Sequence, residues 1–261
     1  MAFEVQKEDG IATITINRPD ALNAFTTEMI LGLTDLVKEM SDDKDVRAVI
    51  ITGTGKAFVA GADVQEMSEK DHDGAVAFSR RGNKMCDAIE QMPQPVIGVI
   101  NGFALGGGCE LALACDVRLA ADGVKLGQPE VGLGIPPGWG GTQRLPRIVG
   151  IGRAKEIIFS GRHIETAEAL DIGLVNAVYP ADELMDQARK MAFTFMENGP
   201  EALAASKKLI NRTMETSLSS GTIHESKLFA AAFNGDEQSE GMEAFLERRK
   251  PSFARSAASD S

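Results

Sequence analysis

Apolar and polar residues alternate with the period of a strand at the start of the chain and with that of a helix soon afterwards. Residues 3–7 and 11–17 flank Asp9-Gly10, a strong signal for a two-residue hairpin turn. The second arm is rich in Ile and Thr, which suit a pleated surface. Residues 27–40 place apolar side chains at helical spacing behind two threonines that can cap a helix. The chain is therefore expected to open as a β-hairpin followed by a helix.

Short apolar runs and longer helical patterns then alternate along the middle of the chain. Strands are predicted at residues 46–52, 95–101, 116–120, 125–127 and 174–179, and helices at residues 73–91, 107–115, 142–149, 153–160 and 166–170. Strands and helices that alternate in this way favour an α/β core.

The last quarter of the chain contains helical patterns without intervening strands. They cover residues 181–198, 200–213, 221–233 and 237–249. We therefore expect an α/β core with the active site in residues 1–195, followed by a helical C-terminal region in residues 196–261. The Ser- and Ala-rich tail after Lys250 is expected to be disordered.

Composition limits the possible classes of protein. With 261 residues, 43% hydrophobic and 25% charged, the chain is long and apolar enough for a sizeable core and a pocket. The formal charge of -11 argues against a nucleic-acid partner, which normally requires a basic surface. No signal peptide, membrane-length apolar stretch or paired cysteine spacing is found. A cytoplasmic location is expected, although a processed matrix protein would look the same.

Two glycine-rich segments follow predicted strands. Residues 53–63 have neither the phosphate-loop nor the dinucleotide spacing, so an ordinary strand-to-helix turn is the simpler interpretation. Residues 101–113 place Gly106-Gly107-Gly108 before a helix that starts with Glu110 among apolar residues. This pattern fits either a tightly packed helix or an anion-binding helix N-terminus beside a catalytic carboxylate.

A third segment, residues 127–142, is too rich in Gly and Pro for a regular element. It still contains apolar side chains, so it is expected to pack over something, such as the wall of a pocket. Glu130 lies within it and could equally be a surface acid. Considered singly, each of the three segments has an ordinary structural explanation.

Taken together, the segments identify a family. Gly106-Gly107-Gly108-Cys109-Glu110 and Gly127-Gln128-Pro129-Glu130 resemble the motifs of the crotonase (enoyl-CoA hydratase/isomerase) superfamily, and the likeness extends from Asn17 to Lys250. Within it, the sequence is most similar to short-chain enoyl-CoA hydratases. The resemblance implies an α/β fold, a spiral of ββα units followed by a helical C-terminal trimerisation region. It also implies a homo-oligomer, either a trimer or a hexamer formed as a dimer of trimers.

The resemblance further implies reversible syn addition of water to a short 2-enoyl-CoA in fatty-acid β-oxidation. The backbone N–H groups of Ala62 and Gly107 would form the oxyanion hole, Glu110 would act as base, and Glu130 would protonate the α-carbon. Because both acids are present, hydration is favoured over isomerisation. Which glutamate holds the proton at rest is left open.

Contacts to the substrate or its coenzyme A are also implied by the resemblance. They involve Lys56, Ala60, Asp63, Gly138, Trp139, Phe245 and Arg248, the last two often reaching a neighbouring subunit's site. Asp20 and Gln65 stand where relatives often have basic residues, so weaker phosphate contacts, or contacts from other cations such as Arg18, are expected. The three scattered histidines suggest no metal, and no cofactor beyond the substrate's coenzyme A is expected.

Two further alternatives are a non-catalytic acyl-CoA- or RNA-binding member of the fold and a serine hydrolase. The acidic charge balance and the two glutamates argue against the first. No Ser–His–acid set can be assembled for the second.

Overall fold

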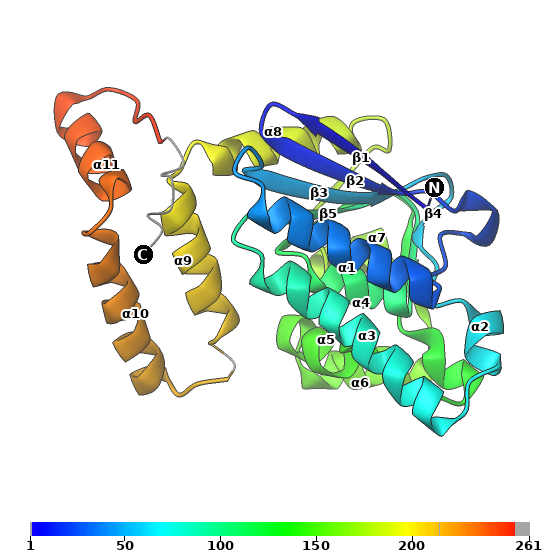
Figure 1. Ribbon diagram of the computed structural model, residues 1–261. Coiled ribbons are helices and arrows are strands. Elements are labelled where there is room, and N and C mark those ends of the chain that lie inside the picture. The colour runs from blue at the N-terminus through cyan, green and yellow to red at the C-terminus, as the bar shows by residue number, and fades with distance from the viewer. Residues whose placement is uncertain (1, 214, 254–261) are drawn as a thin grey trace.

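The computed structural model describes residues 2–213 and 215–253 and contains two β-sheets (Figure 1). The six-stranded sheet has the order β1 (Phe3–Glu8), β2 (Ile11–Ile16), β3 (Ala48–Gly53), β5 (Val96–Ile100), β7 (Val117–Ala121), β10 (Ala177–Tyr179). The four-stranded sheet has the order β4 (Ala57–Val59), β6 (Phe103–Leu105), β8 (Lys125–Gly127), β9 (His163–Glu165). Apart from the β1–β2 hairpin and the β8–β9 pair, neighbouring strands are parallel.

Helices connect these strands and cover the large sheet. They are η1 (Pro19–Ala21), α1 (Thr27–Asp42), α2 (Val64–Ser68), α3 (His72–Gln91), α4 (Gly107–Ala114), η2 (Pro129–Leu133), α5 (Gly141–Val149), α6 (Ile151–Ser160), α7 (Thr166–Asp171), α8 (Leu184–Met196), α9 (Pro200–Asn211), α10 (Leu218–Ala232) and α11 (Asp236–Glu247). The α1 and α3 helices lie along one face of the six-stranded sheet, and α8 lies on the other (Figure 1). This two-sided cover explains why β3 and β5 are continuous apolar runs.

The sequence predicted most of these elements and missed the shortest ones. The three-residue strands β4, β6 and β9 and the five-residue helix α2 were not predicted, because so few residues show no periodicity. The strand predicted at 174–179 is wrong over its first half. There the N–H groups of Leu174 and Val175 bind the Ala169 carbonyl in the turn after α7, so only residues 177–179 join the sheet.

The order of the strands is a spiral of repeated ββα units. In each unit the first strand (β3, β5 or β7) joins the six-stranded sheet and the second (β4, β6 or β8) joins the four-stranded sheet. A helical segment then leads to the next unit. The spiral predicted from the family resemblance is therefore present.

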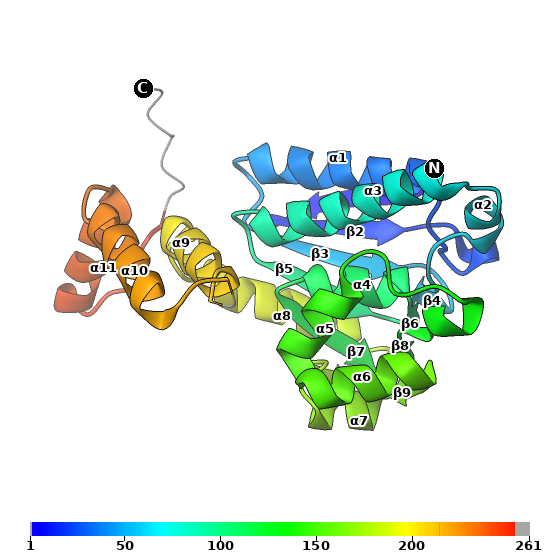
Figure 2. The same ribbon diagram turned by 90° about the horizontal axis from the view of Figure 1, so that it is seen from below.

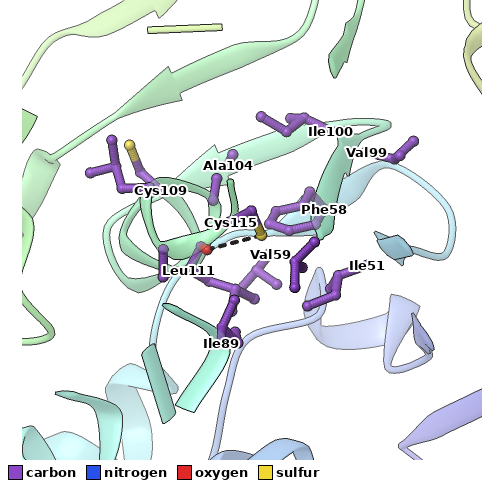
Figure 3. Packing of buried hydrophobic residues seen from close by; sticks show 14 of the residues in the cluster. Ile51, Phe58, Val59, Ile89, Val99, Ile100, Ala104, Cys109, Leu111 and Cys115 are labelled. Atoms are coloured by element: carbon purple, nitrogen blue, oxygen red, sulfur yellow. Dashed lines mark hydrogen bonds between the residues drawn. The ribbon is translucent and has the colours of Figure 1, made fainter. Parts of the chain in front are cut away.

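The α4 helix lies inside the core, and all eight of its residues are buried. Apolar side chains from β3, β4, β5 and α3 surround it, as Figure 3 shows for Ile51, Val59 and Ile89. A Cβ atom at Gly108 would overlap the carbonyl group of Val59, so only glycine allows α4 to approach β4 this closely. This close approach brings the start of α4 beside the end of β4.

Helices α9, α10 and α11 project to one side of the core (Figures 1 and 2). Lys207 on α9 fixes this arm to the core through Asp116, at 2.7 Å, and through the carbonyl groups of Ile89 and Gln94. The predicted division at residues 195 and 196 stays a prediction. The predicted disordered tail after Lys250 lies outside the described residues from 254 onward.

Candidate active site

Three neighbouring parallel strands end at the same edge of the four-stranded sheet. Val59 of β4 pairs with Ala104 of β6, and Leu105 of β6 pairs with Gly127 of β8. Ala62, Gly107 and Glu130 each follow within three residues of the end of one of these strands. The carboxyl ends of parallel strands are where α/β proteins usually bind ligands. The topology thus gathers residues from all three glycine-rich segments.

Glu110 lies in the first turn of α4 and is almost fully buried, with 1% of its surface exposed. Its Oε1 atom accepts hydrogen bonds from the backbone N–H groups of Trp139 and Gly141, each at 2.7 Å. Burial raises the pKa of Glu110, while those two N–H groups and the Arg144 guanidinium oppose the rise. Its carboxylate is therefore buried but has hydrogen-bond donors that stabilise the ionised form.

Glu130 lies in η2 and is also buried. Among the described residues, neither of its carboxyl oxygens has a hydrogen-bond partner. Burial, followed by the charge of Glu110, raises the pKa of Glu130 to about 7. The surface-acid interpretation of Glu130 is therefore wrong. The two glutamates interact electrostatically but lie in different surroundings, one with donors and one without.

The backbone N–H groups of Ala62 and Gly107 have no acceptor within the described part of the chain. On either side of Ala62, the Gly61 carbonyl accepts from Phe25 N–H and Asp63 N–H donates to the Phe25 carbonyl. Gly107 is the first residue of α4, where no carbonyl group one turn earlier is available. Both donors are thus free to bind an oxygen of a ligand.

Trp139 is buried, with 3% of its surface exposed, and packs between α3 and α4. Its ring lies against Phe78, at 5.6 Å between ring centroids, and against Phe25, at 6.3 Å. A Cβ atom at Gly82 or Gly107 would overlap the ring, so the indole directly contacts the backbone of both glycines. The side chain therefore lies in the core beside one candidate oxyanion donor.

Gly138 is held by α3, because its carbonyl accepts from Ser79 Oγ at 2.6 Å and Asn83 Nδ2 at 2.9 Å. Lys56 and Ala60 flank β4. The Lys56 side chain is exposed, and the Ala60 N–H donates to the Leu22 carbonyl at 3.0 Å.

Asp63 has a structural role that the sequence did not indicate. Its carboxylate accepts from the Glu66 N–H as the N-cap of α2 and forms an ion pair with Arg18 at 2.8 Å. The hydrogen bond from Arg18 lowers the pKa of Asp63. Phe245 and Arg248 belong to α11 and its C-cap on the projecting arm, away from α4 of the same chain (Figure 1).

Two residues near the glutamates were missed by the sequence interpretation. Gln128 is fully buried, and its Oε1 atom has no partner among the described residues. Its position inside the Gly-Gln-Pro-Glu motif was the available signal. Arg144 donates to Trp139 and to two acids of α3, and no local pattern links partners more than fifty residues apart.

No metal site or membrane helix is found in the described ranges. Within residues 2–213 and 215–253, no group of three or more His, Cys, Asp or Glu side chains could hold a metal ion. No helix in the same ranges is long and apolar enough to cross a membrane.

A buried pair of carboxyl groups beside two free N–H donors is the arrangement of an acid–base enzyme acting on a substrate that gains negative charge on oxygen. The Enoyl-CoA hydratase/isomerase family model matches residues 6–256. The chain belongs to the enoyl-CoA hydratase/isomerase family.

Individual relatives agree with this assignment. The chain is 46% identical to a short-chain-enoyl-CoA hydratase of Clostridium acetobutylicum, over 94% of this chain and 95% of the relative. It is also 46% identical to a crotonyl-CoA hydratase of Syntrophomonas wolfei, over 97% and 99%. The crystal structure of an enoyl-CoA hydratase from Bacillus anthracis superposes with a TM-score of 0.94 at 37% identity, covering 98% of this chain and all of that one. The predicted family and fold class are confirmed.

Proposed function

We propose that this chain is a hydro-lyase that adds water reversibly to a short 2-enoyl-CoA and forms the 3-hydroxyacyl-CoA. Relatives named for short-chain-enoyl-CoA and crotonyl-CoA hydration, each 46% identical over nearly the whole chain, support this activity. The observation that carries the mechanism is the contrast between Glu110, whose carboxylate accepts two N–H groups, and Glu130, whose carboxyl has no partner among the described residues.

The first role concerns the thioester oxygen. Attack of water on the β-carbon moves an electron pair through the double bond, and negative charge develops on that oxygen. The N–H groups of Ala62 and Gly107 bind it, because they are fixed and have no competing acceptor in the described chain. Loss of one such donor typically slows an enzyme by about 100- to 1000-fold.

The second role concerns the protons. Glu110 accepts the proton of the attacking water, because the Trp139 and Gly141 N–H groups and the charge of Arg144 favour its ionised form against the effect of burial. Glu130 gives a proton to the α-carbon as the enolate collapses, because its pKa of about 7 leaves much of it protonated near neutrality. Water thus becomes the β-hydroxyl and α-hydrogen, and proton exchange restores both glutamates. In this proposal Glu130 is the glutamate that holds the proton at rest.

The coenzyme A part of the substrate is proposed to lie along β4, near the exposed Lys56 side chain and the Ala60 carbonyl. Phe245 and Arg248 would reach it from a neighbouring subunit, since they lie on the arm. Phe245 is 82% exposed and Leu246 is 80% exposed, which leaves apolar surface for such contacts. We therefore propose a homotrimer, or a hexamer of two trimers, built through helices α9–α11.

Three further expectations remain part of the proposal. The reaction is expected to need no cofactor beyond the coenzyme A of the substrate, and no nucleic-acid partner is expected. A cytoplasmic location and a place in fatty-acid β-oxidation stay predictions.

The activity is tested by following the absorbance of crotonyl-CoA, whose conjugated double bond is lost on hydration. The wild-type protein should consume it, whereas Glu110→Gln and Glu130→Gln should each turn over about 100- to 10,000-fold more slowly with little change in KM. Exposed Glu69→Gln is the control and should match the wild type. Wild-type turnover in either active-site variant would contradict the role given to that glutamate.

A further inference from the structure

The loop of residues 136–141, which ends at the first residue of α5, supplies both backbone donors of Glu110. Its donors come from Trp139 and Gly141, and they can bind one carboxylate oxygen only if the loop is held in place. A displacement of about 1 Å in an active site can slow catalysis by about 100-fold. Whatever fixes this loop therefore controls the base of the proposed reaction.

Arg144 makes the contacts that such an anchor requires. Its Nη1 donates to the Trp139 carbonyl at 2.9 Å. Its Nε and Nη2 bind the two carboxylate oxygens of Glu90 on α3, each at 2.8 Å, and Nη2 also binds Asp87 at 2.8 Å. The side chain is only 12% exposed. Every nitrogen of the guanidinium is thus engaged, and the planar fork joins the loop to α3.

We propose that Arg144 is a positioning residue that fixes the loop of residues 136–141 to α3 and so presents the Trp139 and Gly141 N–H groups to Glu110. Its charge also favours the ionised form of Glu110. This role rests on the proposed function of Glu110 as base, but the effect of Arg144 on the position of the loop can be measured without substrate.

The surroundings of Glu110 leave few other charged groups. Glu130 of η2 interacts with it, as do the thiols of Cys86 on α3 and Cys109 on α4. Burial raises the pKa of both thiols, so they stay neutral across the usual assay range. Among the described residues, Arg144, with the Glu90 and Asp87 carboxylates that it binds, and Glu130 are therefore the charged groups expected to set the pH response of Glu110.

The test compares Arg144→Gln with Arg189→Gln, a matched control on α8 whose guanidinium pairs with Glu8 and Asp9 on the opposite side of the core. Trp139 is the single tryptophan of the chain, so its fluorescence reports the position of the loop. In Arg144→Gln, the emission should shift to longer wavelength and acrylamide should quench it more strongly. In Arg189→Gln, both should match the wild type.

Kinetics supply the second readout. Arg144→Gln should lower kcat by about 10- to 100-fold with little change in KM. It should also move the acidic limb of kcat/KM to higher pH, because the ionised Glu110 loses a stabilising charge. Arg144→Lys retains the charge but cannot bind Glu90 and the Trp139 carbonyl in one planar fork. Arg144→Lys should therefore have a kcat between those of the wild type and Arg144→Gln, and its acidic limb of kcat/KM should stay near the wild-type pH.

Each result has a defined meaning. A folded Arg144→Gln protein with wild-type emission, kcat and pH limb would overturn the proposal. A lower melting temperature without change in these three would do the same, because it would show a merely structural ion pair. If Arg144→Gln does not fold, Arg144→Lys is judged by its emission and kcat. An inactive wild-type protein would instead overturn the proposed function.

Discussion

Replacing Glu130 with Gln should stabilise the folded protein above neutral pH while it removes most of the hydratase activity. The carboxyl of Glu130 is buried without a hydrogen-bond partner among the described residues. Burial and the charge of Glu110 raise its pKa from 4.5 to about 7. The folded state therefore binds this proton more tightly than the unfolded chain does. The free energy of unfolding must fall as the pH rises from 4.5 to about 7.

The size of the effect follows from the two pKa values. Each tenfold difference in proton affinity is worth about 1.4 kcal/mol, so the wild-type protein loses on the order of 3 kcal/mol across this window. Glutamine is neutral at every pH and has nearly the same shape. The free energy of unfolding of Glu130→Gln should therefore equal that of the wild type below this pH window and exceed it by about 3 kcal/mol above the window. For a chain of this length, that is roughly 6–12 °C in melting temperature.

The measurement is thermal or urea unfolding of the wild type, Glu130→Gln and the exposed Glu69→Gln at about pH 5 and about pH 8. The first variant should gain stability relative to the wild type mainly at the higher pH, and the second at neither. Turnover of Glu130→Gln should be about 100- to 10,000-fold lower at both. An equal gain in stability at both pH values, or no gain at the higher pH, would contradict the conclusion that the Glu130 carboxyl is buried without a hydrogen-bond partner.

Three other outcomes are expected. Glu110→Gln should lower kcat strongly at nearly unchanged KM, because an amide cannot accept the proton of the attacking water; steady-state kinetics with crotonyl-CoA check this. Trp139→Ala should lose about 3–5 kcal/mol of stability by emptying a core site. If the space opens to the acyl chain, it should also raise kcat/KM for a long enoyl-CoA over crotonyl-CoA by about tenfold, and an unchanged ratio in folded protein would exclude Trp139 from that pocket. Sedimentation should show trimers or hexamers, and a 27.8 kDa monomer alone would rule out assembly through α9–α11.

The sequence predicted the larger elements of the fold because their signals are local. The hairpin around Asp9-Gly10 and the strands β3 and β5 follow from turn chemistry and apolar runs. The strands β4, β6 and β9 went unnoticed, since three residues cannot display a period. Their existence depends on pairing with partners far along the chain.

The same division applies to the candidate site. The motifs around Glu110 and Glu130 predicted which two acids belong to the site, and the family resemblance implied their roles. Their electrostatic difference depends on tertiary contacts, because the Glu110 donors come from residues 139 and 141 and Glu130 gains none. The sequence alone therefore could not distinguish the surroundings of the two acids.

Arg144 and Asp63 illustrate what the amino-acid sequence by itself leaves open. The local sequence around a charged residue in a glycine-rich region does not indicate whether that residue anchors a loop, caps a helix or contacts a ligand. In the structure, Asp63 caps α2 and pairs with Arg18. Arg144 instead joins the loop of residues 136–141 to α3. Sequence fixes which chemical groups are available and where helices and long strands form. Tertiary packing decides which groups meet, because hydrogen bonding and burial depend on neighbours that lie far apart in the chain.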